Sequence, residues 1–326
     1  MISSSEAQRP NILVALPTYR RVGLLPELIA RVREEIERTD AHTRILVLDN
    51  DPERSAEAVA ASIAAPYAAQ PDPGIAATRQ AGLNAAADDE LVVMIDDDLV
   101  PEPGWLAGLL DAWHQHRPAV VMGYVRYVWP AGTDPWVAAG GFMRRSHYPT
   151  GHEIDTLATG NVLIDTAQVR ELGVAFDASM GLSGGSDEQF GRDLVAAGGR
   201  IVASADSVAR DDVVAERVEI AALRERTICQ GQAHVRILMR DQTVGGHIAK
   251  RAGHLVGGLI RLPTFTAAER LARLRGDIPA SAVYRRRAWF AQGRILATLG
   301  RSTYLYARDP APTASTRQSA SGMIVS

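Results

Sequence analysis

The sequence predicts an α/β protein whose largely parallel sheet is flanked by helices and followed by a helical C-terminal extension. Short apolar runs, which are typical of buried strands, alternate with segments whose apolar residues recur at helical spacing. Beyond residue 218 only the helical pattern continues, and the last residues are rich in Ser, Thr, Ala and Pro. We therefore expect an α/β domain at 1–218, a helical extension at 219–308 and a disordered tail at 309–326.

The composition excludes several classes of protein. With 326 residues, of which 46% are hydrophobic and 22% charged, the chain is typical of a soluble globular protein with a large core. The net charge of -3 gives no overall basic surface for nucleic acid. The single cysteine, Cys229, excludes an internal disulfide and indicates a reducing compartment. Because residues 1–10 lack the apolar core of a signal peptide and no uncharged apolar run approaches the length of a membrane span, we expect a cytoplasmic protein.

The N-terminal part of the chain alternates between predicted strands and helices. Strands are predicted where apolar runs end at proline or acidic residues, and helices where aliphatic residues recur at helical spacing. In chain order, the elements are a strand at 11–16 ended by Pro17, a helix over 25–36, a strand at 45–48, a helix through 59–63, an alanine-rich helix over 74–87 and a strand at 91–95. This order favours a parallel sheet with helices on both faces.

Three carboxylates, Asp96, Asp97 and Asp98, directly follow the strand predicted at 91–95. Ligands bind at the carboxyl ends of strands in open α/β sheets, and adjacent like charges repel one another unless a cation or ligand hydroxyls share the site. Asp96 and Asp98 can face the same point around a tight bend, which suits Mg²⁺ or Mn²⁺ bound together with phosphate oxygens. The alternative is a solvated acidic loop that caps the helix near Gly104.

A second acidic side chain, Asp49, follows the strand predicted at 45–48. Since the strands of a parallel sheet end at the same edge, we expect Asp49 and the three carboxylates to line one crevice. The loop at 17–23 has no glycine fingerprint for a dinucleotide, and the chain has no phosphate-binding loop with its lysine. Phosphate would therefore be handled by a metal at the three carboxylates.

The middle of the chain contains further predicted elements and two loops. The elements are an amphipathic helix over 105–113, a strand at 119–122, a strand with a polar break at 157–164 and a helix that begins near Asp187. The segment 124–153 has no clear period, and such long irregular segments are often functional loops. Residues 181–186 are predicted to be a mobile glycine-rich loop. Asp187 and Glu188 are favoured in a first helical turn by the helix dipole, so capping is the simpler explanation for both.

The region from Glu219 onward is helical in pattern and locally basic. Lys250, Arg251, Arg261 and the arginines at 285–287 lie beside aromatic and aliphatic residues. This composition predicts either a face that contacts a membrane surface or, as is more common, the solvated side of packed helices.

Seven short segments between Asn11 and Arg217 together carry a resemblance to a known family. They are Leu16-Pro17-Thr18-Tyr19-Arg20, Val47-Leu48-Asp49-Asn50, Gly74 to Gln80, Ile95-Asp96-Asp97-Asp98, Thr159-Gly160-Asn161, Phe176-Asp177 and Gly184 to Arg192. Each segment is weak alone, but all of them in this order resemble the family 2 glycosyltransferases. That family has the GT-A fold, a Rossmann-like, mostly parallel sheet flanked by helices.

The resemblance implies a donor site over residues 1–218 for a nucleotide-diphosphate sugar, usually a UDP-sugar. The implied donor-binding residues are Pro17, Thr18, Tyr19, Arg20, Asp49, Arg79, Asp96, Asp97, Thr159, Gly160 and Asn161. Tyr19 would lie against the base, Asp49 would hydrogen-bond the base, and Asp96 would approach the ribose. Asp98, together with Asp96, would hold the divalent metal, Mn²⁺ or Mg²⁺.

The resemblance also implies inverting transfer to an acceptor hydroxyl of a glycan, a lipid-linked molecule or a natural product. Such a hydroxyl needs a positioned carboxylate to take its proton, and the leaving nucleoside diphosphate needs its charge neutralised by the metal. Asp187 occupies the place of the family's catalytic carboxylate, with Glu188 as the rival.

Two features depart from the family pattern. Ser186-Asp187 stands where a Glu-Asp pair is common. Many members also have a histidine that helps to hold the metal, where this chain reads Ser207 to Asp212. Asp211 or Asp212 would replace that histidine, and Arg217 follows, as in a subset of the family.

Two other functions stay open at this point. Residues 181–185 fit the nucleophile elbow of a serine hydrolase with Ser183 as nucleophile, although the residues before them do not read as the required strand. A non-catalytic nucleotide-sugar-binding protein would bind the donor but transfer no sugar.

Overall fold

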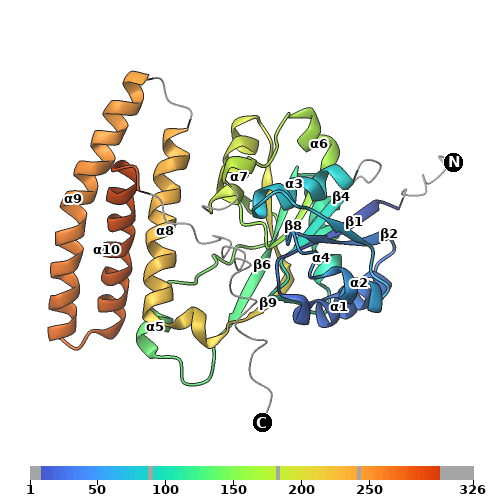
Figure 1. Cartoon of the computed structure of the whole chain (residues 1–326), viewed down its shortest axis with the longest axis horizontal. Coiled ribbons are helices and arrows are strands. Elements are labelled where there is room, and N and C mark those ends of the chain that lie inside the picture. Colours follow the sequence, from blue (N-terminus) through green and yellow to red (C-terminus); the bar gives the residue numbers. More distant parts are fainter. Residues whose placement is uncertain (1–8, 87–90, 181–183, 241–243, 302–326) are drawn as a thin grey trace, which may run out of the picture.

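The computed structural model describes residues 9–86, 91–180, 184–240 and 244–301. A curled mixed sheet carries helices on both faces, and a layer of long helices stands beside it (Figure 1). The predicted fold class, α/β with a helical C-terminal region, is therefore confirmed. The domain boundary at 218/219 stays a prediction, and the predicted tail at 309–326 lies outside the described residues.

The sheet of the described chain has nine strands in the order β3-β2-β1-β4-β8-β6-β9-β5, with β7 paired to β9. The strands are β1 (Asn11–Thr18), β2 (His42–Asp49), β3 (Tyr67–Ala69), β4 (Leu91–Ile95), β5 (Leu99–Pro101), β6 (Val120–Val128), β7 (Glu153–Ile154), β8 (Asn161–Asp165) and β9 (Ile201–Asp212). The first four strands along the sheet are parallel, whereas β8 is antiparallel to both of its neighbours. Ile95, the last residue of β4, therefore pairs with Asn161, the first residue of β8.

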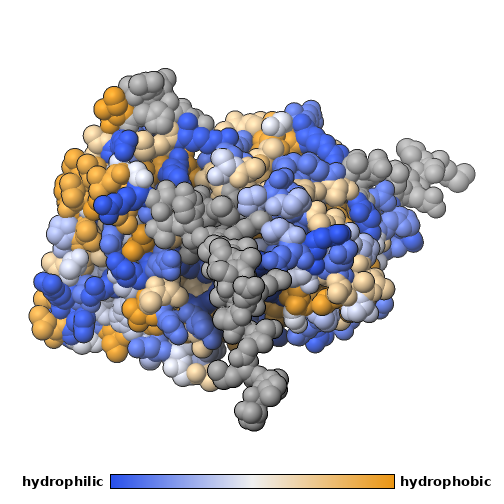
Figure 2. Space-filling model, viewed as in Figure 1, coloured by the Kyte–Doolittle hydropathy of each residue, from blue (hydrophilic) through white to orange (hydrophobic). Residues whose placement is uncertain are grey.

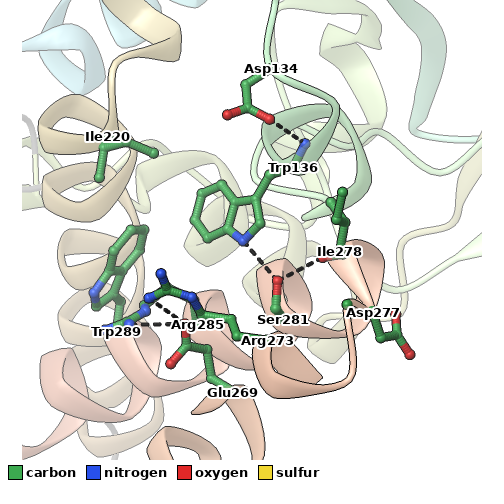
Figure 3. Close-up of a pocket in the computed structure, with 11 residues that line it drawn as sticks. Asp134, Trp136, Ile220, Glu269, Arg273, Asp277, Ile278, Ser281, Arg285 and Trp289 are labelled. Atoms are coloured by element: carbon green, nitrogen blue, oxygen red, sulfur yellow. Dashed lines mark hydrogen bonds and ion pairs between the residues drawn. The ribbon is translucent and has the colours of Figure 1, made fainter. Parts of the chain in front are cut away.

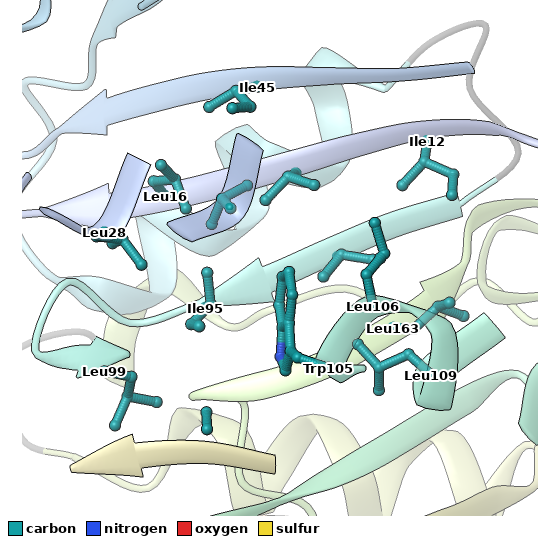
Figure 4. Packing of buried hydrophobic residues seen from close by; sticks show 14 of the residues in the cluster. Ile12, Leu16, Leu28, Ile45, Ile95, Leu99, Trp105, Leu106, Leu109 and Leu163 are labelled. Carbon is teal, nitrogen blue, oxygen red and sulfur yellow. The ribbon is translucent and has the colours of Figure 1, made fainter. Parts of the chain in front are cut away.

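Helices cover both faces of the sheet. They are α1 (Leu25–Glu37), α2 (Glu57–Ser62), α3 (Ile75–Ala85), α4 (Trp105–His116), α5 (Pro135–Ala139), α6 (Thr166–Glu171) and α7 (Ser186–Ala196), with 3-10 turns η1 (Val22–Leu24), η2 (Ala178–Met180) and η3 (Ala215–Val218). One apolar cluster joins α1 and α4 to the sheet, and the fully buried Trp105 lies within it (Figure 4). A second cluster joins α3, α6 and α7 to the opposite face. Because both faces are covered, the apolar runs of β1 and β4 are buried along almost their whole length.

Two stretches differ from the predicted elements. The segment 124–153 was expected to be irregular, but β6 extends to Val128 and α5 occupies 135–139, so the prediction was wrong for those residues. Pairing with β9 extends β6, and a sequence period does not reveal such a partner. The strand predicted at 157–164 begins only at Asn161, because the preceding Gly160 turns its carbonyl toward the backbone N–H of Asp96.

Three long helices, α8 (Ile220–Met239), α9 (Val244–Leu274) and α10 (Ile278–Thr298), form the C-terminal layer (Figure 1). The α8 and α10 backbones approach closely at two glycines, since a Cβ at Gly293 would lie 2.1 Å from the Ile228 carbonyl oxygen. Trp289 of α10 packs with Val137 and Phe142, which links α10 to α5. Among the described residues, no helix has the length and apolar character required to cross a bilayer.

Candidate active site

The carboxyl ends of β1, β2 and β4 carry most of the predicted donor-binding residues. Pro17 pairs with Leu48 inside the β1–β2 ladder, and Thr18 is the last residue of β1. Arg20 adopts the left-handed backbone region with φ of 56°, and its guanidinium lies 5.3 Å from the centre of the Tyr19 ring. Its Nε also contacts Asp51 Oδ2 at 3.2 Å. The loop after β1 therefore presents an aromatic ring and a cation at the sheet edge.

Asp97 is buried and binds residues of its own chain. Its carboxylate accepts hydrogen bonds from the Thr18 hydroxyl at 2.8 Å and from Arg21 Nη1 at 3.0 Å. Burial raises the pKa of Asp97 to about 6, although the charge of Arg21 and the Thr18 hydrogen bond act in the opposite direction. Asp97 thus ties the loop after β4 to the end of β1.

Asp96 lies between Arg79 and the backbone at Gly160. Its Oδ1 contacts Arg79 Nη2 at 3.2 Å, and about a third of its side chain is exposed. Its backbone N–H donates to the Gly160 carbonyl oxygen at 3.1 Å. A Cβ at Gly160 would lie only 2.8 Å from Asp96 Oδ2, so any larger residue here would displace the Asp96 carboxylate. The antiparallel pairing of β8 with β4 creates this contact between two segments that are distant in sequence.

Asp98 and Asp211 converge on one cationic nitrogen. Arg217 Nη1 lies 3.5 Å from Asp98 Oδ2 and 3.0 Å from Asp211 Oδ1, and Arg21 Nη1 lies 2.8 Å from the same Asp98 oxygen. Burial raises the pKa of Asp211, and the charge of Arg217 opposes this rise. Asp212, the other candidate metal ligand of β9, points to solvent and binds Arg210.

The pair Asp98 and Asp211 suits a hard divalent cation in chemistry, and both carboxylates approach the same guanidinium nitrogen. Both are carboxylates, and they already share one positive charge. The part of the chain that the structure describes contains no cluster of three His, Cys, Asp or Glu side chains able to hold a metal by themselves. The remaining ligands would therefore have to be water or oxygens of a bound molecule, as in sites where Mg²⁺ is held by one or two carboxylates and by substrate phosphates.

Asp49 is fully buried, and its carboxylate is surrounded by donors of its own chain. It accepts hydrogen bonds from the backbone N–H groups of Asp51 and Ala56, at 2.9 and 2.8 Å, and from the Tyr67 hydroxyl at 3.2 Å. These contacts fix the turn after β2. The expected hydrogen bond from Asp49 to a base stays a prediction, and this burial does not favour it.

Thr159 and Asn161 lie on either side of Gly160 at the start of β8. The Asn161 side chain accepts a hydrogen bond from Trp105 Nε1 at 2.8 Å and donates to the Tyr124 carbonyl oxygen at 3.2 Å. The Thr159 hydroxyl is buried, and no partner for it is found among the described residues. Asn161 therefore holds the start of β8 against Trp105 and Tyr124, whereas the Thr159 hydroxyl has no partner in the part of the chain that the structure describes.

Asp187 and Glu188 occupy the first turn of α7, after Gly185 with φ of 92°. Asp187 Oδ1 accepts a hydrogen bond from the Glu188 backbone N–H at 2.9 Å. Glu188 forms an ion pair with Arg192 at 3.1 Å, one helical turn further on. Of the two carboxylates, Glu188 is thus the one already bound to a cation of its own helix.

Arg145 connects the two carboxylate clusters electrostatically, and the sequence did not single it out. Burial lowers the pKa of Arg145, but the nearby Tyr127, Asp187 and Asp96 more than offset this, so the pKa is raised. Its Nε is buried without a partner among the described residues. Arg21 was missed as well. Both arginines lie in segments without regular spacing, and the only sequence signal for Arg145 was its position in the irregular, arginine-containing stretch 124–153.

Comparisons with known proteins agree with this arrangement. The family model described as Glycosyl transferase family 2 matches residues 13–166. The succinoglycan biosynthesis protein ExoM of Rhizobium meliloti (strain 1021) is 30% identical over 234 residues, which cover 70% of this chain and 75% of ExoM.

Two solved structures share the fold. The mannosyltransferase PcManGT from Pyrobaculum calidifontis, in complex with GDP-Man and Mn²⁺, has a TM-score of 0.59 at 18% identity and covers 89% of this chain and 88% of its own. GalNAc-T7 with UDP, GalNAc and Mn²⁺ has a TM-score of 0.53 at 14% identity, over 72% of this chain and 48% of its own.

The fold and the motifs at the sheet edge define a GT-A glycosyltransferase that uses a nucleotide sugar. The chain belongs to glycosyltransferase family 2. The predicted family and the predicted class of enzyme are therefore confirmed. Ser183, the nucleophile of the alternative hydrolase, lies outside the described residues.

Proposed function

We propose that this glycosyltransferase is metal-dependent and inverting, and that it moves a sugar from a UDP-sugar to an acceptor hydroxyl. The observation that carries the proposal is the convergence of Asp98 and Asp211 on Arg217, at the same edge as Asp96. A further carboxylate, Asp187, lies on a different element, the first turn of α7. One carboxylate pair for a metal and one separate carboxylate for a proton are what this reaction requires.

Asp98 and Asp211 would hold Mn²⁺ or Mg²⁺, with Asp96 directed to the ribose of the donor. When it is bound, the metal supplies positive charge that neutralises the leaving nucleoside diphosphate. Arg217 now lies between the two carboxylates, so its guanidinium must shift when a divalent cation takes that position. Asp211 rather than Asp212 is the better replacement for the family's histidine, since Asp212 is engaged by Arg210 at the surface.

Asp187 would take the proton of the acceptor hydroxyl as that oxygen attacks the anomeric carbon. Its rival Glu188 is bound to Arg192, which leaves Asp187 as the freer base. Arg145 brings positive charge close to both Asp187 and Asp96 and would help to orient the donor between them. Thr159 would offer its unused hydroxyl to the transferred sugar or to the acceptor.

Calorimetric titration of UDP, GDP and TDP, each with and without Mn²⁺, tests the donor and the metal together. We expect UDP to bind with the highest affinity and only weakly without Mn²⁺, because the diphosphate charge is otherwise uncompensated. Both nucleotides that occur in the similar structures, GDP-Man and UDP, are found there with Mn²⁺. Tighter binding of GDP or TDP would reject the UDP assignment. Equal UDP affinity with and without Mn²⁺ in the folded protein would reject metal dependence.

We further propose that the outer face of α9 contacts an anionic membrane surface, with the protein on the cytoplasmic side. Ile248, Val256, Leu259 and Ile260 are each more than half exposed, and Figure 2 shows apolar side chains gathered along this helix. The only acidic side chain among the described ones of α9 is Glu269, which is buried. The exposed charges of this helix are therefore cationic, as expected of a helix that lies on anionic lipid.

Sedimentation with lipid vesicles tests this membrane contact. We expect the protein to pellet with phosphatidylcholine vesicles that contain phosphatidylglycerol and much less with phosphatidylcholine alone. Replacing Leu259 and Ile260 by serine should abolish pelleting, because serine side chains do not insert into the apolar part of the lipid layer. The matched variant Leu24→Ser changes an exposed leucine of the α/β part and should pellet normally. Pelleting that is unchanged by the double replacement would exclude this face.

A further inference from the structure

A cavity of about 580 Å³ lies between α5, the first residue of α8, the end of α9 and the start of α10 (Figure 3). Its volume is within the range of ~300–1,000 Å³ that is typical of small-molecule sites. The residues used below are Asp134, Trp136, Glu269, Asp277, Arg285 and Trp289. None of them belongs to the carboxylate groups at the sheet edge, so this is a separate site.

Two indole rings form rigid walls of the cavity. Trp136 of α5 and Trp289 of α10 lie with their centroids 6.3 Å apart at 71°, and Phe142 packs against both at 5.2 and 5.7 Å. The Trp136 ring is also held by a hydrogen bond from its Nε1 to Ser281 Oγ at 3.1 Å. Rings fixed in this way offer preformed apolar faces, and their negative quadrupoles attract C–H groups. The C–H-rich face of a sugar ring has this complementary character.

Glu269 has a free hydrogen-bonding position although it is only 2% exposed. Its Oε1 contacts Arg285 at 3.0 Å and Arg273 at 3.7 Å, but Oε2 is buried without a partner among the described residues. Buried carboxylate oxygens are normally hydrogen-bonded, so this exception needs a reason. A hydroxyl group of a ligand would provide the missing donor.

The charges around the cavity favour a neutral ligand over an anion. Asp134 and Asp277 accept capping hydrogen bonds from backbone N–H groups at the starts of α5 and α10, at 2.8 and 3.0 Å, and both line the cavity. With Glu269, three carboxylates stand against two arginines. A phosphate would meet no excess of positive charge here, whereas the hydroxyls of a sugar can both donate to carboxylates and accept from arginines.

The cavity shares two segments with the catalytic carboxylates. Ile220 lines it, three residues after Arg217, which contacts Asp98 and Asp211. Trp136 lies in the same connection between β6 and β7 as Arg145, whose charge acts on Asp187. The connection is also fastened to α10 near the cavity, where Arg286 Nε donates to the Gly140 carbonyl oxygen at 2.8 Å. These links connect the walls of the cavity to the segments that carry Arg217 and Arg145.

We infer that this cavity binds a neutral sugar ring of the acceptor, distant from the hydroxyl that is glycosylated. The inference rests on the proposed glycosyl transfer and specifies its acceptor class: an oligosaccharide or an oligosaccharide-bearing molecule rather than a small aglycone. Trp136 stacks on the ring, Trp289 forms the adjoining wall at 71° to it, and Glu269 Oε2 accepts a hydrogen bond from one of the sugar hydroxyls.

Ligand-observed NMR with a panel of neutral disaccharides, namely cellobiose, maltose, lactose, gentiobiose and laminaribiose, tests this site. We expect at least one of them to bind, and Trp136→Ala or Glu269→Gln to weaken binding by about tenfold or more, as is usual when an aromatic anchor or a hydrogen bond to a charged group is lost. Glu153→Gln is the matched control, since Glu153 is an exposed partner of Arg200 outside the cavity. Circular dichroism would establish that each variant is folded.

Calorimetric titration of UDP with Mn²⁺ on the same proteins shows whether the donor site is intact in each variant. UDP binding that persists in Trp136→Ala while disaccharide binding falls supports the inference. If the wild type binds UDP but no disaccharide of the panel, or if both variants bind the sugar as tightly as wild type, the inference is overturned while the donor site stands. Stronger binding of inorganic phosphate than of any sugar, lost in Arg285→Gln, would also overturn it. A wild type that binds no nucleotide would instead reject the proposed function.

Discussion

The Asp187→Asn enzyme is expected to bind donor and metal normally and to lose transfer almost completely. The amide keeps the shape of the first turn of α7, including the hydrogen bond from the Glu188 N–H, but it cannot accept the acceptor's proton. Loss of a positioned general base lowers kcat by about 10²–10⁴-fold. The acceptor-dependent rate of UDP release measures transfer, and a calorimetric titration of UDP with Mn²⁺ measures donor binding.

Glu188→Gln is the matched control for Asp187→Asn, since it makes the same chemical change one residue away. Glu188 is paired with Arg192, so its replacement should cost at most a severalfold loss of rate. If Glu188→Gln lost transfer and Asp187→Asn kept it, the base would be Glu188. Nearly full kcat in both variants would exclude a carboxylate base at this helix.

The second large effect is expected from Asp98→Ala, which should remove the gain in UDP affinity that Mn²⁺ provides. Removing a residue that only hydrogen-bonds a metal ligand already costs about 10–100-fold in metal affinity. Removing a direct ligand should therefore cost at least that much. The fold should survive, because Arg21 keeps Asp97 and Arg217 keeps Asp211 as partners. Titration of UDP with and without Mn²⁺ measures the difference.

Asp212→Ala is the control for Asp98→Ala. It removes a carboxylate next to Asp211 that binds Arg210 at the surface, and it should leave the response to Mn²⁺ unchanged. A full response to Mn²⁺ in Asp98→Ala would show that the metal is held elsewhere. A lost response in Asp212→Ala would shift the second ligand from Asp211 to Asp212.

The strands that carry the proposed donor-site residues could be predicted because their own sequence contains the signal. β1, β2 and β4 are apolar runs, and the pattern alone predicts that Asp49 and the three carboxylates lie at one edge. The contact of Gly160 with Asp96 could not be predicted in this way, since it depends on β8 pairing antiparallel to β4. A strand's period reports its buried face but not the direction of its neighbour.

Two of the arginines at the site, Arg21 and Arg145, were less predictable than the acids. Arg21 and Arg145 lie in stretches without regular spacing, and their positions follow from loops folding over the sheet edge. The cavity is a still clearer case, because Asp134, Glu269 and Trp289 are far apart in the chain and meet only through the packing of α5 against α10. No local sequence pattern predicts that these three residues line one cavity.

The arginines paired with the acidic edge have a consequence for how the protein is made and handled. Arg21, Arg79 and Arg217 already lie against Asp96, Asp97, Asp98 and Asp211, so the repulsion among these carboxylates is relieved by the chain itself. Small zinc domains unfold when their ion is removed, because the ion is part of their folding free energy. We therefore expect this chain to fold without an ion and to keep its thermal stability in the presence of a chelator, which a melting curve with and without EDTA would measure. If the proposed metal binds, we expect it to enter with the diphosphate of the donor rather than to be part of the folded chain.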